Sequence, residues 1–124
     1  MKRKEAAIDF IEQSEIPVYT VIEGATASAG TLMSIVGKKR YIRPHASMLI
    51  HQLSSWFGGK MTEIDDDYQN LQQMHESIRQ IYTKHTRIDG DDLGELLKHD
   101  LWWKADKCIE TGLVDGLWDE SMGA

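Results

Sequence analysis

Cysteine, proline and long apolar runs are scarce in this chain of 124 residues. Cys108 is the only cysteine, so no internal disulfide can form, and a reducing compartment is the default expectation. No apolar run approaches the ~20 residues of a membrane-spanning helix. Met1 leads into an amphipathic helical segment without the apolar core of a signal peptide. These absences predict a soluble, cytoplasmic protein.

Positive charge is also in deficit. The chain has 14 lysines and arginines against 20 aspartates and glutamates, which gives a formal net charge of −6. Surfaces that bind nucleic acid are basic, so this balance disfavours a nucleic-acid partner. The one basic cluster, at residues 38–40, is expected to be a solvated turn rather than a phosphate site.

The sequence lacks the patterns that hold common cofactors. It contains no G-x-x-x-x-G-K-[ST] phosphate loop, no H-E-x-x-H motif and no zinc-type spacing of cysteine and histidine. His75 and His85 are therefore expected to pack or to form hydrogen bonds. We expect neither a metal ion nor another cofactor.

What is present is an alternation of helical and strand-like segments, which predicts a single α/β domain. Helices are expected before Pro17 and at residues 32–36, 61–86, 93–97 and 104–111. Strands are expected at residues 18–22, 40–42, 47–51 and 113–114, the first of them a buried parallel strand. Of the adjacent Trp102 and Trp103, one is expected in the core and the other at an edge or interface.

The long helix carries an apolar and aromatic stripe with a seven-residue period. Its members are Ile64, Tyr68, Leu71, His75, Ile78, Tyr82 and His85. Such a stripe usually faces the core of its own domain. The acidic run at residues 65–67 is too polar for deep burial, so a helix that binds a partner is the alternative.

A cluster of small residues at 24–30, Gly-Ala-Thr-Ala-Ser-Ala-Gly, lies between an expected strand and an expected helix. A serine at such a turn exposes its hydroxyl, and small neighbours let a substrate backbone come close. Ser28 is thus a candidate nucleophile. The pattern G-x-S-x-G is not fully met, because Thr26 replaces its first glycine, and a tight packing turn remains an alternative.

His51 ends the next apolar run, where a strand could hold its ring rigidly. Histidine is the side chain best suited to take the proton of a serine nucleophile near neutral pH. Asp100 is the candidate acid that would orient this ring. From the residues alone, a structural histidine and a carboxylate at a turn or helix end remain alternatives.

Four segments resemble motifs of the Clp protease proteolytic subunit (ClpP) family, in the order of that family. Segment 24–30 resembles G-x-A-A-S-M-G, and segment 39–52 resembles the family's K-R-Y/F, P-N-A/S and M-I-H-Q-P motifs. Segment 59–64 resembles G-Q-A-x-D-I, which opens the family's long handle helix. Segment 100–115 resembles the closing pattern that ends in Y-G-L-V-D. On these motifs the chain is identified as a member of the ClpP family.

The resemblance implies a serine endopeptidase that hydrolyses unfolded polypeptide. Matched position by position, Ser28 is the nucleophile, His51 the base and Asp100 the orienting acid. The backbone N–H of Ala29 matches one donor of the oxyanion hole. The residues matched to the substrate-binding strand are Gln52, Leu53 and Ser54.

The fold implied by the resemblance is the ClpP/crotonase fold of repeated ββα units, incomplete at its N-terminus. Its head would comprise residues 1–57 and 88–124, and a protruding handle helix would span about residues 58–87. The resemblance further implies self-association into rings, and as partners a second ClpP-type subunit and an AAA+ ATPase unfoldase.

Three departures from the family pattern leave alternatives for the function. Leu53 and Trp56 replace a proline and a glycine of the substrate-binding strand. The upstream S-P-G-G loop, which supplies the second oxyanion donor, has no counterpart in this sequence. A catalytically weak structural subunit of a mixed ring is one alternative, and a viral-type maturation peptidase of the same family is the other.

Overall fold

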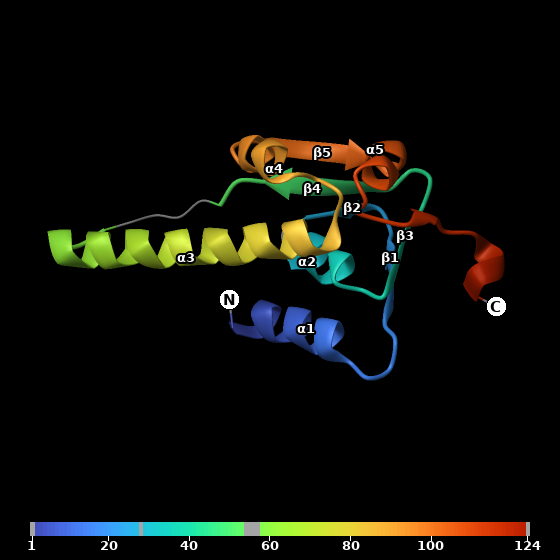
Figure 1. Cartoon of the computed structure of the whole chain (residues 1–124), viewed down its shortest axis with the longest axis horizontal. Coiled ribbons are helices and arrows are strands. Elements are labelled where there is room, and N and C mark those ends of the chain that lie inside the picture. The colour runs from blue at the N-terminus through green and yellow to red at the C-terminus, as the bar shows by residue number, and fades with distance from the viewer. Residues whose placement is uncertain (1, 28, 54–57, 124) are drawn as a thin grey trace.

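A computed structural model describes residues 2–27, 29–53 and 58–123 and shows a mixed α/β architecture (Figure 1). The helices are α1 (Lys2–Gln13), α2 (Ala29–Ile35), α3 (Met61–His85), α4 (Gly90–Leu96), α5 (Ala105–Glu110) and a short 3₁₀ helix, η1 (Glu120–Gly123). The strands are β1 (Tyr19–Ile22), β2 (Ala25–Thr26), β3 (Lys39–Ile42), β4 (Ser47–His51), β5 (Asp100–Lys104) and β6 (Gly116–Leu117). The expected α/β class is confirmed.

The strands form two small sheets. One sheet has the order β1-β3-β6, and both of its pairings are parallel. The other has the order β2-β4-β5, in which β2 runs parallel to β4 while β5 runs antiparallel to it. The second sheet matters for function, because β4 ends at His51 and β5 begins at Asp100.

Two of the expected strands differ from the observed ones. The segment at 18–22 does form a parallel strand, but only its last residue, Ile22, is buried. Tyr19 is 58% exposed, and within the described residues β1 pairs only with β3. The last strand lies at Gly116–Leu117, not at 113–114. Leu113 and Val114 instead fill the core from a turn, which explains their apolar character.

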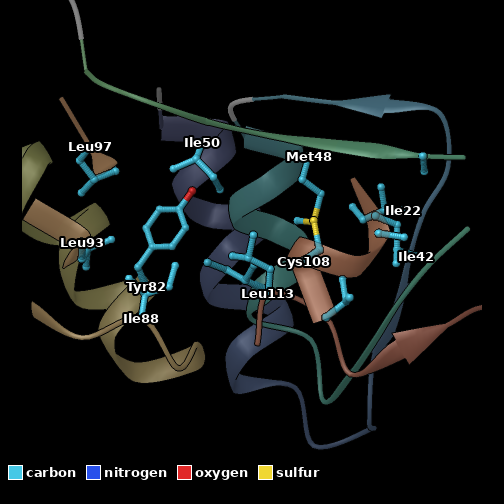
Figure 2. Packing of buried hydrophobic residues seen from close by; sticks show 14 residues of the cluster. Ile22, Ile42, Met48, Ile50, Tyr82, Ile88, Leu93, Leu97, Cys108 and Leu113 are labelled. Carbon is cyan, nitrogen blue, oxygen red and sulfur yellow. The ribbon is translucent and has the colours of Figure 1, made fainter. Parts of the chain in front are cut away.

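The core lies between the inner face of β4 and the helices that cover it. Figure 2 shows Tyr82 of α3 pointing toward Ile50 of β4, with Leu93 and Leu97 beside it. Met48 and Cys108 occupy the other part of the cluster, and both are fully buried. The inner residues of β4 are therefore fixed by packing, and this fixes the direction of the outer ones as well.

The long helix α3 belongs to this core only in its C-terminal half. Tyr82 is 3% exposed, whereas Ile64 and Tyr68 are 38% and 51% exposed. The N-terminal end of α3 extends beyond the rest of the chain (Figure 1). The core-facing interpretation of the stripe thus holds for the C-terminal half of the helix, while the apolar residues of the N-terminal half are exposed. No helix in the described part of the chain combines the length and apolarity needed to cross a bilayer.

Arg40 joins several elements at the root of α3, and the expectation of a solvated basic turn is wrong at this residue. Its side chain is only 13% exposed. The guanidinium donates hydrogen bonds to the carbonyl oxygens of Ile35 (3.1 Å) and His85 (2.6 Å), the last residues of α2 and α3. It also lies 3.5 Å from the carboxylate of Asp115. Because these helix-terminal carbonyls lack partners within their helices, a buried cation is a suitable donor for them.

Candidate active site

Ser28 lies outside the described residues, but both of its flanks are placed. Strand β2 precedes it, and Ala29 is the first residue of α2. A Cβ atom at Gly30 would come within 2.7 Å of the Thr26 methyl group, so only glycine fits this turn without a shift. The Thr31 hydroxyl reaches the carbonyl oxygens of Thr26 (3.3 Å) and Leu49 (3.2 Å). These contacts tie the segment around position 28 to β4.

His51 and Asp100 lie directly opposite each other in the β4–β5 ladder. The neighbouring pair is hydrogen-bonded, since the N–H of Gln52 donates to the carbonyl of His99 at 2.9 Å. Hydrogen-bonded and non-hydrogen-bonded residue pairs alternate along an antiparallel ladder. His51 and Asp100 therefore form a non-hydrogen-bonded pair, whose Cα atoms are typically about 4.5 Å apart. Their side chains therefore lie on the same face at close range.

A backbone carbonyl orients the His51 ring. Its Nδ1 lies 2.8 Å from the carbonyl oxygen of Gln52. A carbonyl can only accept, so Nδ1 donates and carries the proton in this arrangement. The lone pair of the neutral ring is then on Nε2, the form that a general base requires. The Gln52 carbonyl thus helps to orient the ring, a role that the family resemblance gives to Asp100.

The outer face of the β4–β5 ladder carries a pocket of about 350 Å³. Its lining residues are Leu49, His51, Gln52, Asp100 and Trp102. Two of the residues matched to the substrate-binding strand can be placed: Gln52 lines the pocket, and Leu53 is a half-buried residue beyond the end of β4. The third, Ser54, lies outside the described residues, as does Trp56.

Sequence reasoning missed the strand that positions Asp100. The alternative of a turn or helix-end carboxylate is wrong, because Asp100 is the first residue of β5. The Asp-Leu-Trp-Trp-Lys segment is short, but its exposure alternates along the strand. The expected division of the two tryptophans is confirmed: Trp103 packs against the core, and Trp102 is 52% exposed. The sequence signal for β5 is weak, because the three apolar residues between Asp100 and Lys104 are consecutive and show no polar–apolar alternation.

Outside the pocket, the histidine at the C-terminal end of α3 has a structural partner. His85 contacts Glu12 of α1 at 2.6 Å, in line with the hydrogen-bonding role expected for it. Across residues 2–27, 29–53 and 58–123, no three side chains of histidine, cysteine, aspartate or glutamate gather as metal ligands would.

The sequence of this chain matches the family model described as Clp protease over residues 2–121. The match includes both sheets, the long helix and the ladder that carries His51 and Asp100. The mixed α/β architecture agrees with a ClpP-like fold. Members of this family generally assemble into rings and act as serine endopeptidases. On this match the chain belongs to the Clp protease family.

Proposed function

We propose that this chain is a ClpP-like serine endopeptidase subunit that hydrolyses peptide bonds of unfolded polypeptides. Ser28 is its nucleophile, His51 its general base and Asp100 the acid that stabilises the charged histidine. The observation that carries the proposal is the position of His51 opposite Asp100 on the outer face of one ladder. The family match supports the reaction class.

The proposed reaction follows from these positions. The Ser28 hydroxyl attacks the scissile carbonyl carbon while its proton passes to Nε2 of His51. The backbone N–H of Ala29 donates to the resulting oxyanion, because it lies in the first turn of α2, where N–H groups lack helical acceptors. His51 then protonates the leaving amine, and water hydrolyses the acyl-enzyme by the same route. The Asp100 carboxylate offsets the positive charge that His51 carries between these steps.

Self-association is the second part of the proposal. The N-terminal half of α3 presents Met61, Ile64 and Tyr68 to solvent, and Met61 is 86% exposed. Exposed apolar stripes of this kind typically become buried in a partner. We propose that the chain is one domain, with its head at about residues 1–57 and 88–124, and that its copies self-associate into rings. In this assembly α3 is the handle that pairs with the same helix of a copy in the opposing ring. A ClpP-type partner subunit and an AAA+ unfoldase would complete the assembly.

A fluorophosphonate probe tests the catalytic assignment. At neutral pH we expect it to label Ser28, and to label no serine in Ser28→Ala. The variants His51→Ala and Asp100→Asn should reduce the labelling rate by at least about a hundredfold, the lower end of what general-base catalysis contributes. The matched controls are Ser47→Ala, His45→Ala and Asp106→Asn, which change the same residue types away from the pocket.

The outcomes separate the candidate functions. Labelling that persists in His51→Ala would contradict the assignment of the base. If the parent assembles but no serine reacts, the alternative of a catalytically inactive structural subunit is correct instead. Circular dichroism of each variant distinguishes lost chemistry from lost folding.

A further inference from the structure

The hydroxyl of Thr31 is buried at the point where the β2–β4 pairing ends. Within the described residues, the last pair of these parallel strands is Thr26 opposite Met48. Thr31 lies in the first turn of α2 and is 1% exposed. Its Oγ1 lies 3.3 Å from the carbonyl oxygen of Thr26 on β2 and 3.2 Å from that of Leu49 on β4. A hydroxyl has one proton, so the two carbonyls share this donor.

Each of these two carbonyls belongs to a residue two positions before a candidate catalytic residue. Thr26 precedes Ser28 by two residues, and Leu49 precedes His51 by two residues. Two residues of a strand span about 7 Å, so a shift of either carbonyl displaces the residue that follows it. The Thr31 hydroxyl therefore links the segment that leads to the candidate nucleophile with the strand that carries the candidate base.

The ordinary explanation of a threonine within a helix does not apply to Thr31. Serine and threonine hydroxyls in helices commonly bond to the carbonyl four residues earlier. In this chain Ser77 and Thr83 do so, and both bonds are exposed. The two acceptors near Thr31 lie instead on strands outside its helix. Valine has the same shape without the cost of burying a hydroxyl, so these contacts explain why the buried residue is polar.

A separate hydroxyl holds the opposite end of α2. Thr20 of β1 donates from its Oγ1 to the carbonyl oxygen of Ser34 at 2.9 Å. Ser34 is buried in the last turn of α2. Thr31 and Thr20 thus tie the two ends of one helix to different strands. Because Thr20 contacts the end away from the turn at position 28, it offers a matched control.

We propose that Thr31 is a positioning residue whose hydroxyl holds the turn at position 28 at a fixed distance from His51. Since Thr31 is buried, it acts on the reaction only through the two carbonyls that it contacts. Proton transfer depends steeply on the placement of the reacting groups, and a misplacement of about 1 Å can cost about a hundredfold in rate. This catalytic consequence rests on the proposed function, whereas the hold on the turn can be measured without any reaction.

Amide hydrogen exchange measures the turn itself. The N–H of Gly30 donates to the carbonyl of Ala27 at 3.0 Å, across position 28, so its exchange rate shows how firmly the turn is held. Thr31→Val removes the hydroxyl and keeps the shape, and it should speed this exchange at least about fivefold, the effect of one typical hydrogen bond. In Thr20→Val the Gly30 rate should stay at that of the parent. The N–H of Gly37, which bonds at the far end of α2, should respond in the opposite way.

Labelling by the fluorophosphonate probe measures the consequence for Ser28. Thr31→Val should lower the maximal labelling rate at least about tenfold, a cautious fraction of what misplacement can cost. The probe concentration that gives half of the maximal rate should not change. Thr20→Val should label like the parent, although its urea midpoint falls as well.

Two further substitutions separate the hydroxyl from the shape of the side chain. Thr31→Ser keeps the hydroxyl and should restore most of the labelling rate. Thr31→Cys places a thiol there, a much weaker donor, and should restore little. The comparison of serine with cysteine decides the question even if the valine variant does not fold, which circular dichroism would show.

Several results would overturn the inference. Equal losses of labelling in Thr31→Val and Thr20→Val would show a general effect of destabilising α2. Equal labelling in Thr31→Ser and Thr31→Cys would mean that the hydroxyl is not needed. Unchanged labelling or unchanged Gly30 exchange in Thr31→Val would exclude a hold on the turn. If Ser28 is unreactive in the parent while Gly30 exchange depends on Thr31, the hold on the turn is supported and the peptidase assignment fails.

Discussion

At the scale of single residues, Glu12 links the N-terminal helix to the root of the long one. Its carboxylate lies 2.6 Å from Nε2 of His85 and 3.6 Å from the ammonium of Lys84. The hydrogen bond from His85 is the main cause that lowers the pKa of Glu12, and the charge of Lys84 adds to it while burial opposes it. The contact therefore stabilises the folded chain through the ionised form of Glu12.

The direction of the pH dependence follows from this shift. A carboxyl group whose pKa is lower in the folded state stabilises the protein above its unfolded pKa and loses that contribution as the pH falls. For Glu12 the loss begins near its ordinary pKa of 4.5 and proceeds below it. We expect Glu12→Gln to unfold at lower urea concentration than the parent at pH 7, with the difference shrinking steadily toward about pH 3.

The control for this prediction is Glu15→Gln, which neutralises an exposed glutamate close by. Its urea midpoint should follow that of the parent at every pH. If the urea midpoints of the parent and of Glu12→Gln changed with pH in the same way, the prediction would be contradicted, because ionised Glu12 would then contribute nothing to the stability of the fold.

At the scale of elements, the two halves of α3 differ in what they contact. Ile78 packs against the core cluster, while Ile64 and Tyr68 lie on the exposed half. A test of assembly should therefore change only the exposed half. A substitution at Ile78 would disturb folding and association together.

We expect the double variant Ile64→Gln/Tyr68→Gln to sediment as smaller species than the parent, with unchanged helicity. Glutamine keeps the helix propensity and removes the apolar surface. The control variant, Asp66→Gln/Asn70→Gln, changes the opposite side of the same turns, at half a turn from the first pair. Association should survive in that control. A monomeric parent at micromolar concentration would contradict the assembly proposed for α3.

Elements with a strong local pattern could be predicted from the sequence. The period of α3 and the short apolar run of β4 predicted both elements nearly in full, since each pattern is set by neighbouring residues. Strand β2 has only two residues, and β6 has two as well, which is too short for any period. The segment 18–22 has the composition of a central strand, but pairing partners decide burial, and those are not local.

At the scale of the whole molecule, the rate at which the Cys108 thiol is modified is a measure of global stability. Its side chain is fully buried, and its Sγ lies 3.6 Å from the carbonyl oxygen of Trp103. Burial raises the pKa of Cys108 to about 11. Since the thiolate is the reactive form, the native thiol has neither the access nor the ionisation that modification needs.

We expect Cys108 to react with a thiol reagent at pH 8 at least about a thousandfold more slowly in the native chain than in urea, because an unfolding free energy of about 5 kcal/mol leaves so few open molecules. The positive control is Ser121→Cys in a Cys108→Ser background, which places the thiol at an exposed site. It should react quickly without denaturant. Comparable rates for native and unfolded Cys108 would show that the core opens locally.

The candidate pair also belongs to this scale, and for that reason local patterns alone could not identify it. His51 and Asp100 are far apart in the sequence and meet only because β4 and β5 pair. No period or composition predicts that pairing, so Asp100 was selected through the family resemblance. Neither the local patterns nor the family resemblance predicted that Trp102 lies beside this pair, because its position depends on the register of the ladder.

The residues between Gln52 and His99 form the connection from β4 to β5, and the hydrogen bond from the Gln52 N–H to the His99 carbonyl joins the two ends of this connection. The exposed glycines Gly58 and Gly59 belong to it and lie just before α3. A chain divided between them would carry His51 on one fragment and Asp100 on the other. The two fragments would meet along the β4–β5 ladder, where backbone hydrogen bonds can re-form between separate chains. The proposed triad would then exist only when both fragments are bound to each other. Activity of the divided chain would therefore report that the two fragments have associated.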